Sequence, residues 1–173
     1  MISSFVESGM DFTPLFNNSD YKSFYIEKSI DYQMLNKKSN GVKSVEFLSK
    51  KGNSFYFIEA KETFADVEKA DNLEKVQSDF QDLYDKFHHS FLLFISKELK
   101  IKSASTDFAF LNQNMLQNHK IKFYLIIKDS EKMWCKKIED KLKRDIFKPL
   151  CILLNLEIHV IPSEVAKKFK IIT

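Results

Sequence analysis

The chain has 173 residues, of which 44% are hydrophobic and 29% charged, a balance typical of one folded globular domain and not of a disordered chain. Its net charge of +3 permits nucleic-acid binding but is too small to indicate a histone-like binder. No run approaches the roughly 18 apolar residues of a membrane span, and the N-terminus lacks the basic and apolar regions of a signal peptide. We therefore expect a soluble, cytoplasmic protein with no membrane association.

The two cysteines do not indicate a disulfide or a structural metal. Cys135 and Cys151 fall on one long predicted helix, where about 24 Å would separate them if the helix is continuous, too far for a bond. No Cys-x-x-Cys pair or Cys/His cluster occurs, so a structural zinc site is not expected. The thiols are interpreted as buried or inert residues of a reducing compartment.

The first third of the chain predicts an antiparallel meander. The expected elements are a short helix over 2–9 and strands over 23–35, 42–49 and 54–61. Tight turns at Asn40-Gly41 and at Gly52-Asn53 would join the three strands, because glycine beside asparagine is typical of two-residue hairpin loops. The chain has only 3 glycines, so the use of two of them in successive turns supports this interpretation.

Helices and strands alternate in the remainder. The expected elements are a helix over 65–88, a strand over 91–96, a short helix or loop within 103–119, a strand over 121–128, a helix over 131–154, a strand over 157–161 and a helical turn over 163–169. Ser130 is expected to cap the long helix, and Pro149 to kink or divide it. The whole chain, residues 1–173, is thus predicted to be one α/β domain: a mixed central sheet that starts with the three-strand meander and is flanked by helices.

The third predicted strand carries the residues most suited to chemistry. Side chains alternate along a strand, so Glu59 and Lys61 share one face within about 7 Å of each other. Pairing across the preceding hairpin can place Glu46 roughly 5 Å from Glu59. Two carboxylates this close repel each other unless a cation lies between them, and Mg²⁺ or Mn²⁺ is the natural choice for oxygen ligands.

Glu46 followed by Glu59-Ala60-Lys61 resembles the core of the PD-(D/E)XK, or restriction endonuclease-like, nuclease superfamily. In that family an acid on one strand precedes Glu-x-Lys on the next. The similarity extends over most of residues 1–128 and includes the helix after the lysine strand. It implies that Glu46 and Glu59 hold Mg²⁺ or Mn²⁺, and that Lys61 orients a water or stabilises charge on the scissile phosphate.

The same resemblance suggests three further site residues and contains one departure. Gln77 and Gln81, on the helix after the lysine strand, would approach the active site, with plain surface positions as the alternative. Glu7 would provide an additional acid from the first helix, with Glu27 as a weaker candidate. The departure is Val45-Glu46 where the family pattern has Pro-Asp, which puts catalytic competence in question.

These observations predict a metal-dependent nuclease that cleaves phosphodiester bonds, of DNA before RNA, in a defence, repair or mobile-element setting. The alternative is a catalytically silent binding module on the same fold, such as an immunity or antitoxin-like protein or a scaffold subunit with a protein partner. A third interpretation is an unrelated α/β domain in which Glu59 and Lys61 form an ordinary exposed cross-strand pair. His88-His89 is expected at a helix C-terminus, where histidine interacts favourably with the helix dipole.

Overall fold

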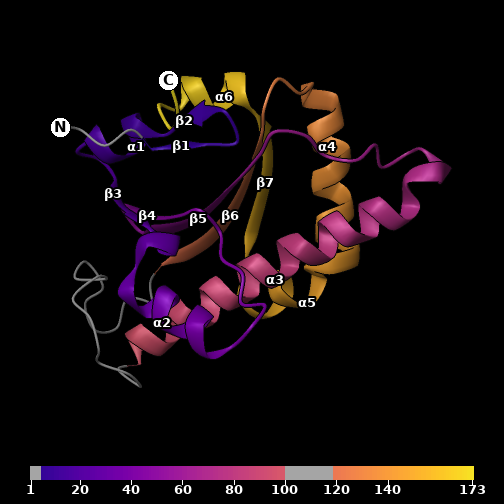
Figure 1. Ribbon diagram of the computed structural model, residues 1–173. Coiled ribbons are helices and arrows are strands. Elements are labelled where there is room, and N and C mark those ends of the chain that lie inside the picture. Colours follow the sequence, from indigo (N-terminus) through magenta and orange to yellow (C-terminus); the bar gives the residue numbers. More distant parts are fainter. Residues whose placement is uncertain (1–4, 100–118) are drawn as a thin grey trace.

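A computed structural model of the chain describes residues 5–99 and 119–173. A five-stranded sheet lies between two layers (Figure 1): α2, α3, α4 and α5 cover one face, and α1, α6 and the two short strands β1 and β2 cover the other. The elements, in chain order, are β1 (Val6–Glu7), β2 (Met10–Asp11), α1 (Thr13–Asn17), β3 (Lys22–Tyr25), η1 (Ile26–Lys28), α2 (Ile30–Lys38), β4 (Phe47–Lys51), β5 (Ser54–Lys61), η2 (Ala70–Asn72), α3 (Leu73–Glu98), β6 (Lys120–Ile127), α4 (Lys132–Lys141), η4 (Leu142–Ile146), α5 (Lys148–Leu153), β7 (Glu157–Pro162) and α6 (Ser163–Lys168).

The sheet has the strand order β3-β4-β5-β6-β7, so neighbours in space are also neighbours in sequence. β4 is antiparallel to both β3 and β5, whereas β5, β6 and β7 are parallel to one another. The parallel pairs require crossover connections, which α3 supplies after β5 and α4, η4 and α5 supply after β6. The predicted mixed α/β sheet is therefore confirmed.

Several elements agree with the local sequence pattern. β5 spans Ser54–Lys61 as expected, and β6, β7 and α6 lie within one or two residues of their predicted bounds. The β4–β5 hairpin has Lys51 opposite Ser54, which leaves Gly52-Asn53 as a two-residue loop. Gly52 has φ +53°, the conformation that such a loop requires and that glycine adopts without strain.

The predicted helix over 2–9 is wrong within the described residues. Val6–Glu7 is a strand that pairs with Met10–Asp11, and Ser8 and Gly9 form the loop between them. Both loop residues have positive φ, +50° and +66°. Gly9 therefore closes a hairpin and does not end a helix.

The predicted strand over 23–35 is correct only at its beginning. β3 ends at Tyr25, and α2 starts after Ser29, whose Oγ accepts a hydrogen bond from the backbone N–H of Tyr32 at 3.0 Å. This N-cap outweighs the β propensity of the stretch. Because a helix now separates β3 from β4, Gly41 (φ +84°) lies in an irregular segment after α2, and the first of the two expected hairpin turns is not formed there.

The predicted strand over 91–96 is also wrong, because α3 continues through it to Glu98. The buried positions Phe80, Leu83, Phe87 and Phe94 follow one helical face without interruption. Short apolar runs do not distinguish a buried strand from a buried helix segment, and here the helix extends a period that begins at Val76. The short helix or loop predicted within 103–119 lies almost wholly outside the described residues.

The predicted helix over 131–154 is divided into α4, the π-helical turn η4 and α5, with Pro149 in the first turn of α5. The N-cap residue is Glu131 and not Ser130, whose Oγ instead donates to the Ile127 carbonyl at 3.1 Å. Cys135 and Cys151 are free, as expected. Across the described residues, no helix is both long and apolar enough to cross a membrane.

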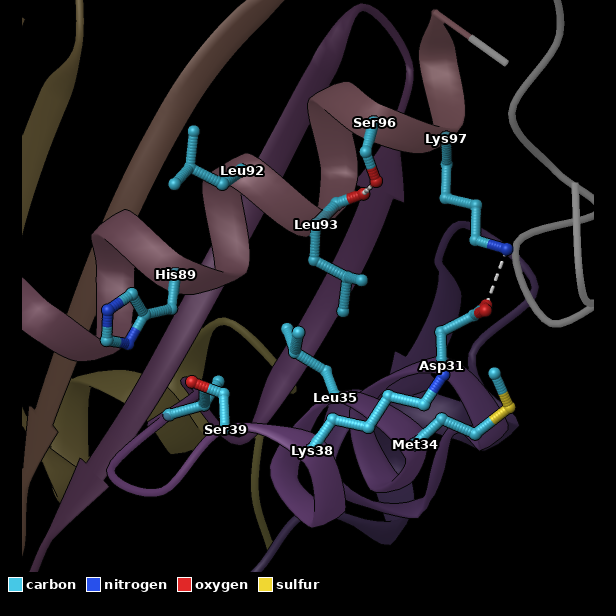
Figure 2. A pocket seen from close by; sticks show the side chains of 11 residues that line it. Asp31, Met34, Leu35, Lys38, Ser39, His89, Leu92, Leu93, Ser96 and Lys97 are labelled. Carbon is cyan, nitrogen blue, oxygen red and sulfur yellow. Dashed lines mark hydrogen bonds and ion pairs between the residues drawn. The ribbon is translucent and has the colours of Figure 1, made fainter. Parts of the chain in front are cut away.

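A largely apolar pocket of about 520 Å³ lies between α2 and α3 (Figure 2). Met34 and Leu35 line it from α2, and Leu92 and Leu93 from α3. The Lys97 ammonium and the Asp31 carboxylate form an ion pair at one end, 2.5 Å apart. The pocket also touches Val42 and His89, which belong to the framework that positions the candidate site.

Candidate active site

Glu46 and Glu59 lie beside each other on the sheet face that α3 covers. Phe47 pairs with Ile58 across the β4–β5 hairpin, so the residue before Phe47 reaches the level of the residue after Ile58. Glu59 is fully buried and Glu46 is 7% exposed. The structure thus brings together the two carboxylates that the strand pairing predicts, although Glu46 itself precedes β4.

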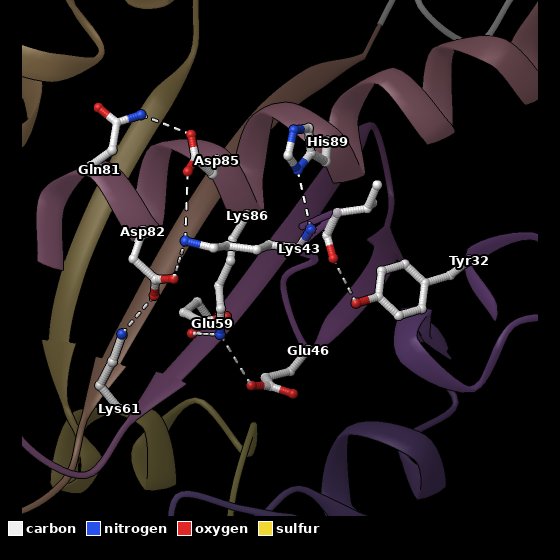
Figure 3. Close-up of polar contacts among 11 residues, drawn as sticks. Tyr32, Lys43, Glu46, Glu59, Lys61, Gln81, Asp82, Asp85, Lys86 and His89 are labelled. Carbon is white, nitrogen blue, oxygen red and sulfur yellow. Dashed lines mark hydrogen bonds and ion pairs between the residues drawn. The ribbon is translucent and has the colours of Figure 1, made fainter. Parts of the chain in front are cut away.

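The cation between these carboxylates is an ammonium group from α3 (Figure 3). Lys86 Nζ lies 2.6 Å from Glu59 Oε1 and 3.8 Å from Glu46 Oε1. The second Glu59 oxygen, Oε2, is buried and has no hydrogen-bond partner within residues 5–99 and 119–173. A buried carboxylate oxygen without a donor is costly, and this oxygen is the one of the pair that is open to a further interaction.

Burial changes the acidity of both carboxyls, and the charge of Glu59 adds to the shift of Glu46. Burial, followed by the charge of Glu59, raises the pKa of Glu46 to about 8. Burial raises the pKa of Glu59 to about 7, against the opposing effect of Lys86. Burial would lower the pKa of Lys86, but the Glu59 carboxylate outweighs it and holds the ammonium charged. Both carboxyls thus ionise less readily than free glutamates, and the Lys86 ammonium balances the charge that the pair keeps.

Lys61 lies on the same face as Glu59 but is held by another acid. Its Nζ contacts Asp82 Oδ2 at 2.9 Å, and Lys43 Nζ contacts the other oxygen of Asp82 at 3.0 Å (Figure 3). Burial opposes ionisation of Asp82, yet the hydrogen bonds from Lys61 and Lys43 lower its pKa overall. Asp82 is thus an ionised anchor that sets where both lysines lie.

The irregular segment that ends at Glu46 is attached to α3 through its backbone. The N–H of Lys43 donates to His89 Nδ1 at 3.1 Å, and the N–H of Val45 donates to Ser90 Oγ at 2.9 Å. These bonds fix Glu46 without a strand ladder. The prediction that His89 lies at a helix C-terminus is wrong, because α3 continues past it to Glu98.

The other predicted site residues have different positions. Glu7 lies on β1, where it accepts a hydrogen bond from the Tyr25 hydroxyl, and its charge and that of Glu27 contribute to the raised pKa of Glu46. Glu7 is therefore near the carboxylate pair but reaches it from a strand. Gln77 is exposed on α3 nine residues before Lys86, about 13.5 Å along the helix, and is not brought to the carboxylates. Gln81 donates to Asp85 at 2.7 Å.

Three residues of α3 that the sequence does not predict complete the site. Asp82, Lys86 and Ser90 follow one another at four-residue spacing, which places them on one face of α3. Each reaches toward the strand segment that carries the acids. The sequence signal for these residues is the polar stripe that runs beside the apolar stripe of this long helix.

Comparison with family models, with curated proteins and with solved structures finds no match to this chain. The assessment of a metal therefore depends on the residues alone. Paired carboxylates with one unsatisfied buried oxygen are ligands of the kind Mg²⁺ and Mn²⁺ prefer, and Mg²⁺ commonly takes only one or two carboxylates and keeps several waters. Within the described ranges no group of three or more His, Cys, Asp or Glu side chains is placed to hold a metal ion.

The raised pKa of Glu46 predicts a pH-dependent stability difference. Between the unfolded value of 4.5 and the folded value of about 8, the folded protein binds more protons than the unfolded chain, so this group destabilises the fold as pH rises. Glu46→Gln removes the effect. Without metal, its Tm relative to wild type is expected to increase from pH 5 to pH 8 by on the order of 5 °C. A Tm difference that stays constant over this range would contradict the assignment.

Proposed function

We propose that this chain is a metal-dependent phosphodiesterase with a PD-(D/E)XK-like core that cleaves nucleic acid, DNA before RNA. The observation that carries the proposal is the buried Glu46–Glu59 pair, with Glu59 Oε2 unsatisfied among the described residues and Lys61 on the same strand face. A solvated cross-strand ion pair, the simplest alternative, would leave these carboxylates exposed, and they are not.

The arrangement of elements supports the same proposal. The acid precedes one strand, Glu-x-Lys ends the neighbouring antiparallel strand, and α3 follows and covers both acids. β6 then pairs with β5 in parallel, so the lysine strand is central in the sheet. This order resembles the one that the family similarity implies for residues 1–128.

Each side chain has a definable chemical task. Glu46 and Glu59 would supply oxygen ligands to Mg²⁺ or Mn²⁺, which when bound polarises a phosphate and lowers the pKa of water. Lys61 lies on the same face of β5 as Glu59. Its Nζ would leave Asp82 and stabilise the charge that develops on the phosphate oxygens. Asp82 holds this lysine in position in the absence of substrate.

The silent binding module is the second candidate, because one observation favours it. Lys86 already occupies the position beside both carboxylates, which partly neutralises them without a metal. A protein that had lost catalysis could keep such a pair as a structural element. Binding of divalent metal separates the two candidates, since only the phosphodiesterase requires it.

The proposed function is tested by incubating purified protein with plasmid and with single- and double-stranded oligonucleotides in Mg²⁺ or Mn²⁺. We expect cleavage that EDTA abolishes and that Lys61→Ala lowers by about 10²-fold, since groups that stabilise transition-state charge contribute effects of this size. Lys132→Ala is the matched control, because this exposed lysine pairs only loosely with Glu164 at 3.7 Å. Lack of cleavage by wild type, or full activity of Lys61→Ala, would contradict the proposal.

A further inference from the structure

One lysine occupies the place where the proposed function needs a metal. Lys86 Nζ is 2.6 Å from Glu59 Oε1, and its side chain is only 19% exposed. It comes from α3, whereas both acids come from the strand segments below, so the contact bridges the helix and the sheet (Figure 3). The remaining oxygen, Glu59 Oε2, lacks any partner in the part of the chain that the structure describes.

The Lys86 ammonium and a divalent cation would compete for the same two oxygens, Glu59 Oε1 and Glu46 Oε1. Mg²⁺ binds carboxylate oxygen at about 2.0–2.1 Å, so a metal bound through these two oxygens would lie against Lys86 Nζ in its present position. At contact distance in a buried site, the repulsion between the two cations is much greater than in water. A metal that takes the Oε1 oxygens therefore requires Lys86 to leave Glu59.

A second acid is available to Lys86 on its own helix. Asp82 precedes it by four residues, the spacing at which side chains on a helix meet, and the Asp82 charge already acts on Lys86. At present Asp82 holds Lys61 and Lys43. An additional ammonium at Asp82 would compete with Lys61 for the same carboxylate oxygens.

We propose that Lys86 is a resident counter-ion that a divalent metal must displace from Glu59, and that its move to Asp82 releases Lys61 toward the substrate phosphate. This inference rests on the proposed function and adds a regulatory step to it. Loading of the site is linked to release of the lysine that acts on the phosphate. The metal-free protein keeps its acids neutralised and its Lys61 restrained.

The first experiment measures Mn²⁺ binding by isothermal titration calorimetry at one pH, without nucleic acid. Lys86→Met removes the competing cation but keeps an apolar stem of similar length, and we expect it to bind Mn²⁺ at least about tenfold more tightly than wild type. Lys75→Met is the matched control, because Lys75 is exposed on the same helix, and its affinity should equal that of wild type. Tighter binding by Lys86→Met, even if wild type binds no Mn²⁺, supports displacement. Equal or weaker binding overturns it.

A second variant keeps the test decisive if Lys86→Met does not fold. Lys86→Arg retains the charge and can hold a carboxylate through two donors, so it should be harder to displace and should bind Mn²⁺ several-fold more weakly than wild type. Unchanged or tighter binding would overturn the proposal.

The move of Lys86 to Asp82 is tested separately by comparing Asp82→Asn with Asp85→Asn. The second substitution removes the same charge from α3 at a residue that is not the proposed acceptor of Lys86. Weaker binding of Mn²⁺ in Asp82→Asn than in Asp85→Asn supports the exchange, and equal affinities overturn it.

These outcomes are independent of catalysis. If the Lys86 variants change Mn²⁺ affinity as expected but no preparation cleaves nucleic acid, the proposed function fails and the counter-ion role stands. If the protein cleaves nucleic acid with Mg²⁺ and the variants leave affinity unchanged, the proposed function stands and this inference fails.

Discussion

Glu59→Gln is expected to reduce metal-dependent cleavage of nucleic acid by at least about 10²-fold and to abolish measurable Mn²⁺ binding. The substitution keeps the size and shape of a fully buried side chain but removes the charge that a divalent cation requires. Because burial raises the pKa of Glu59 to about 7, the ionised form is disfavoured in the folded protein. The loss of charge should therefore cost little stability above neutral pH, even though the contact to Lys86 is weakened.

The measurement combines cleavage rates, calorimetry and thermal unfolding at pH 8. Glu62→Gln is the matched control, because Glu62 lies three residues further on, is 68% exposed and pairs with Lys128 at 3.5 Å. It should behave like wild type in all three assays. The assignment of Glu59 would be refuted by a Glu59→Gln protein that remains folded and still cleaves at the wild-type rate.

Phe87→Ala is expected to have the largest effect on stability. Phe87 is fully buried on α3, and its ring lies 5.2 Å from that of Phe57 and 5.5 Å from those of Phe123 and Phe147, measured between centroids. Truncation of a phenylalanine in such a position leaves a cavity that costs about 3–5 kcal/mol. For a domain of this size, the Tm should fall by roughly 10 °C.

The same substitution should also impair the site. Phe87 is adjacent to Lys86, and Phe57 precedes Glu59 by two residues on the same strand face, so their ring contact sets the distance between helix and strand. Thermal unfolding of Phe87→Ala and of Phe169→Ala provides the comparison, since Phe169 is 52% exposed and should tolerate truncation with a Tm change within a few degrees. Similar losses in the two variants would show that the Phe57–Phe87 contact does not support the fold as described.

The sequence by itself determined those strands and turns whose conformation depends on residues close together in the chain. β5 and β6 were predictable because uninterrupted β-branched and aromatic runs form buried central strands. The Gly52-Asn53 loop was predictable because its backbone conformation favours glycine, and this loop places Glu46 beside Glu59. The core of the candidate site was accessible only in part, since the hairpin register brings Glu46 level with Glu59 but bonds to α3 hold the segment that carries Glu46.

The tertiary structure alone decided what depends on contacts between distant segments. Residues 91–96 join α3, where Phe94 packs against Phe55 and Phe57 of β5, a contact between segments far apart in the sequence. Lys86 became part of the site in the same way, because α3 crosses the sheet at the level of Glu59. Residues on a helix and a strand meet only when the packing of their apolar faces sets the crossing, and that packing also determined that an ammonium lies between the two acids.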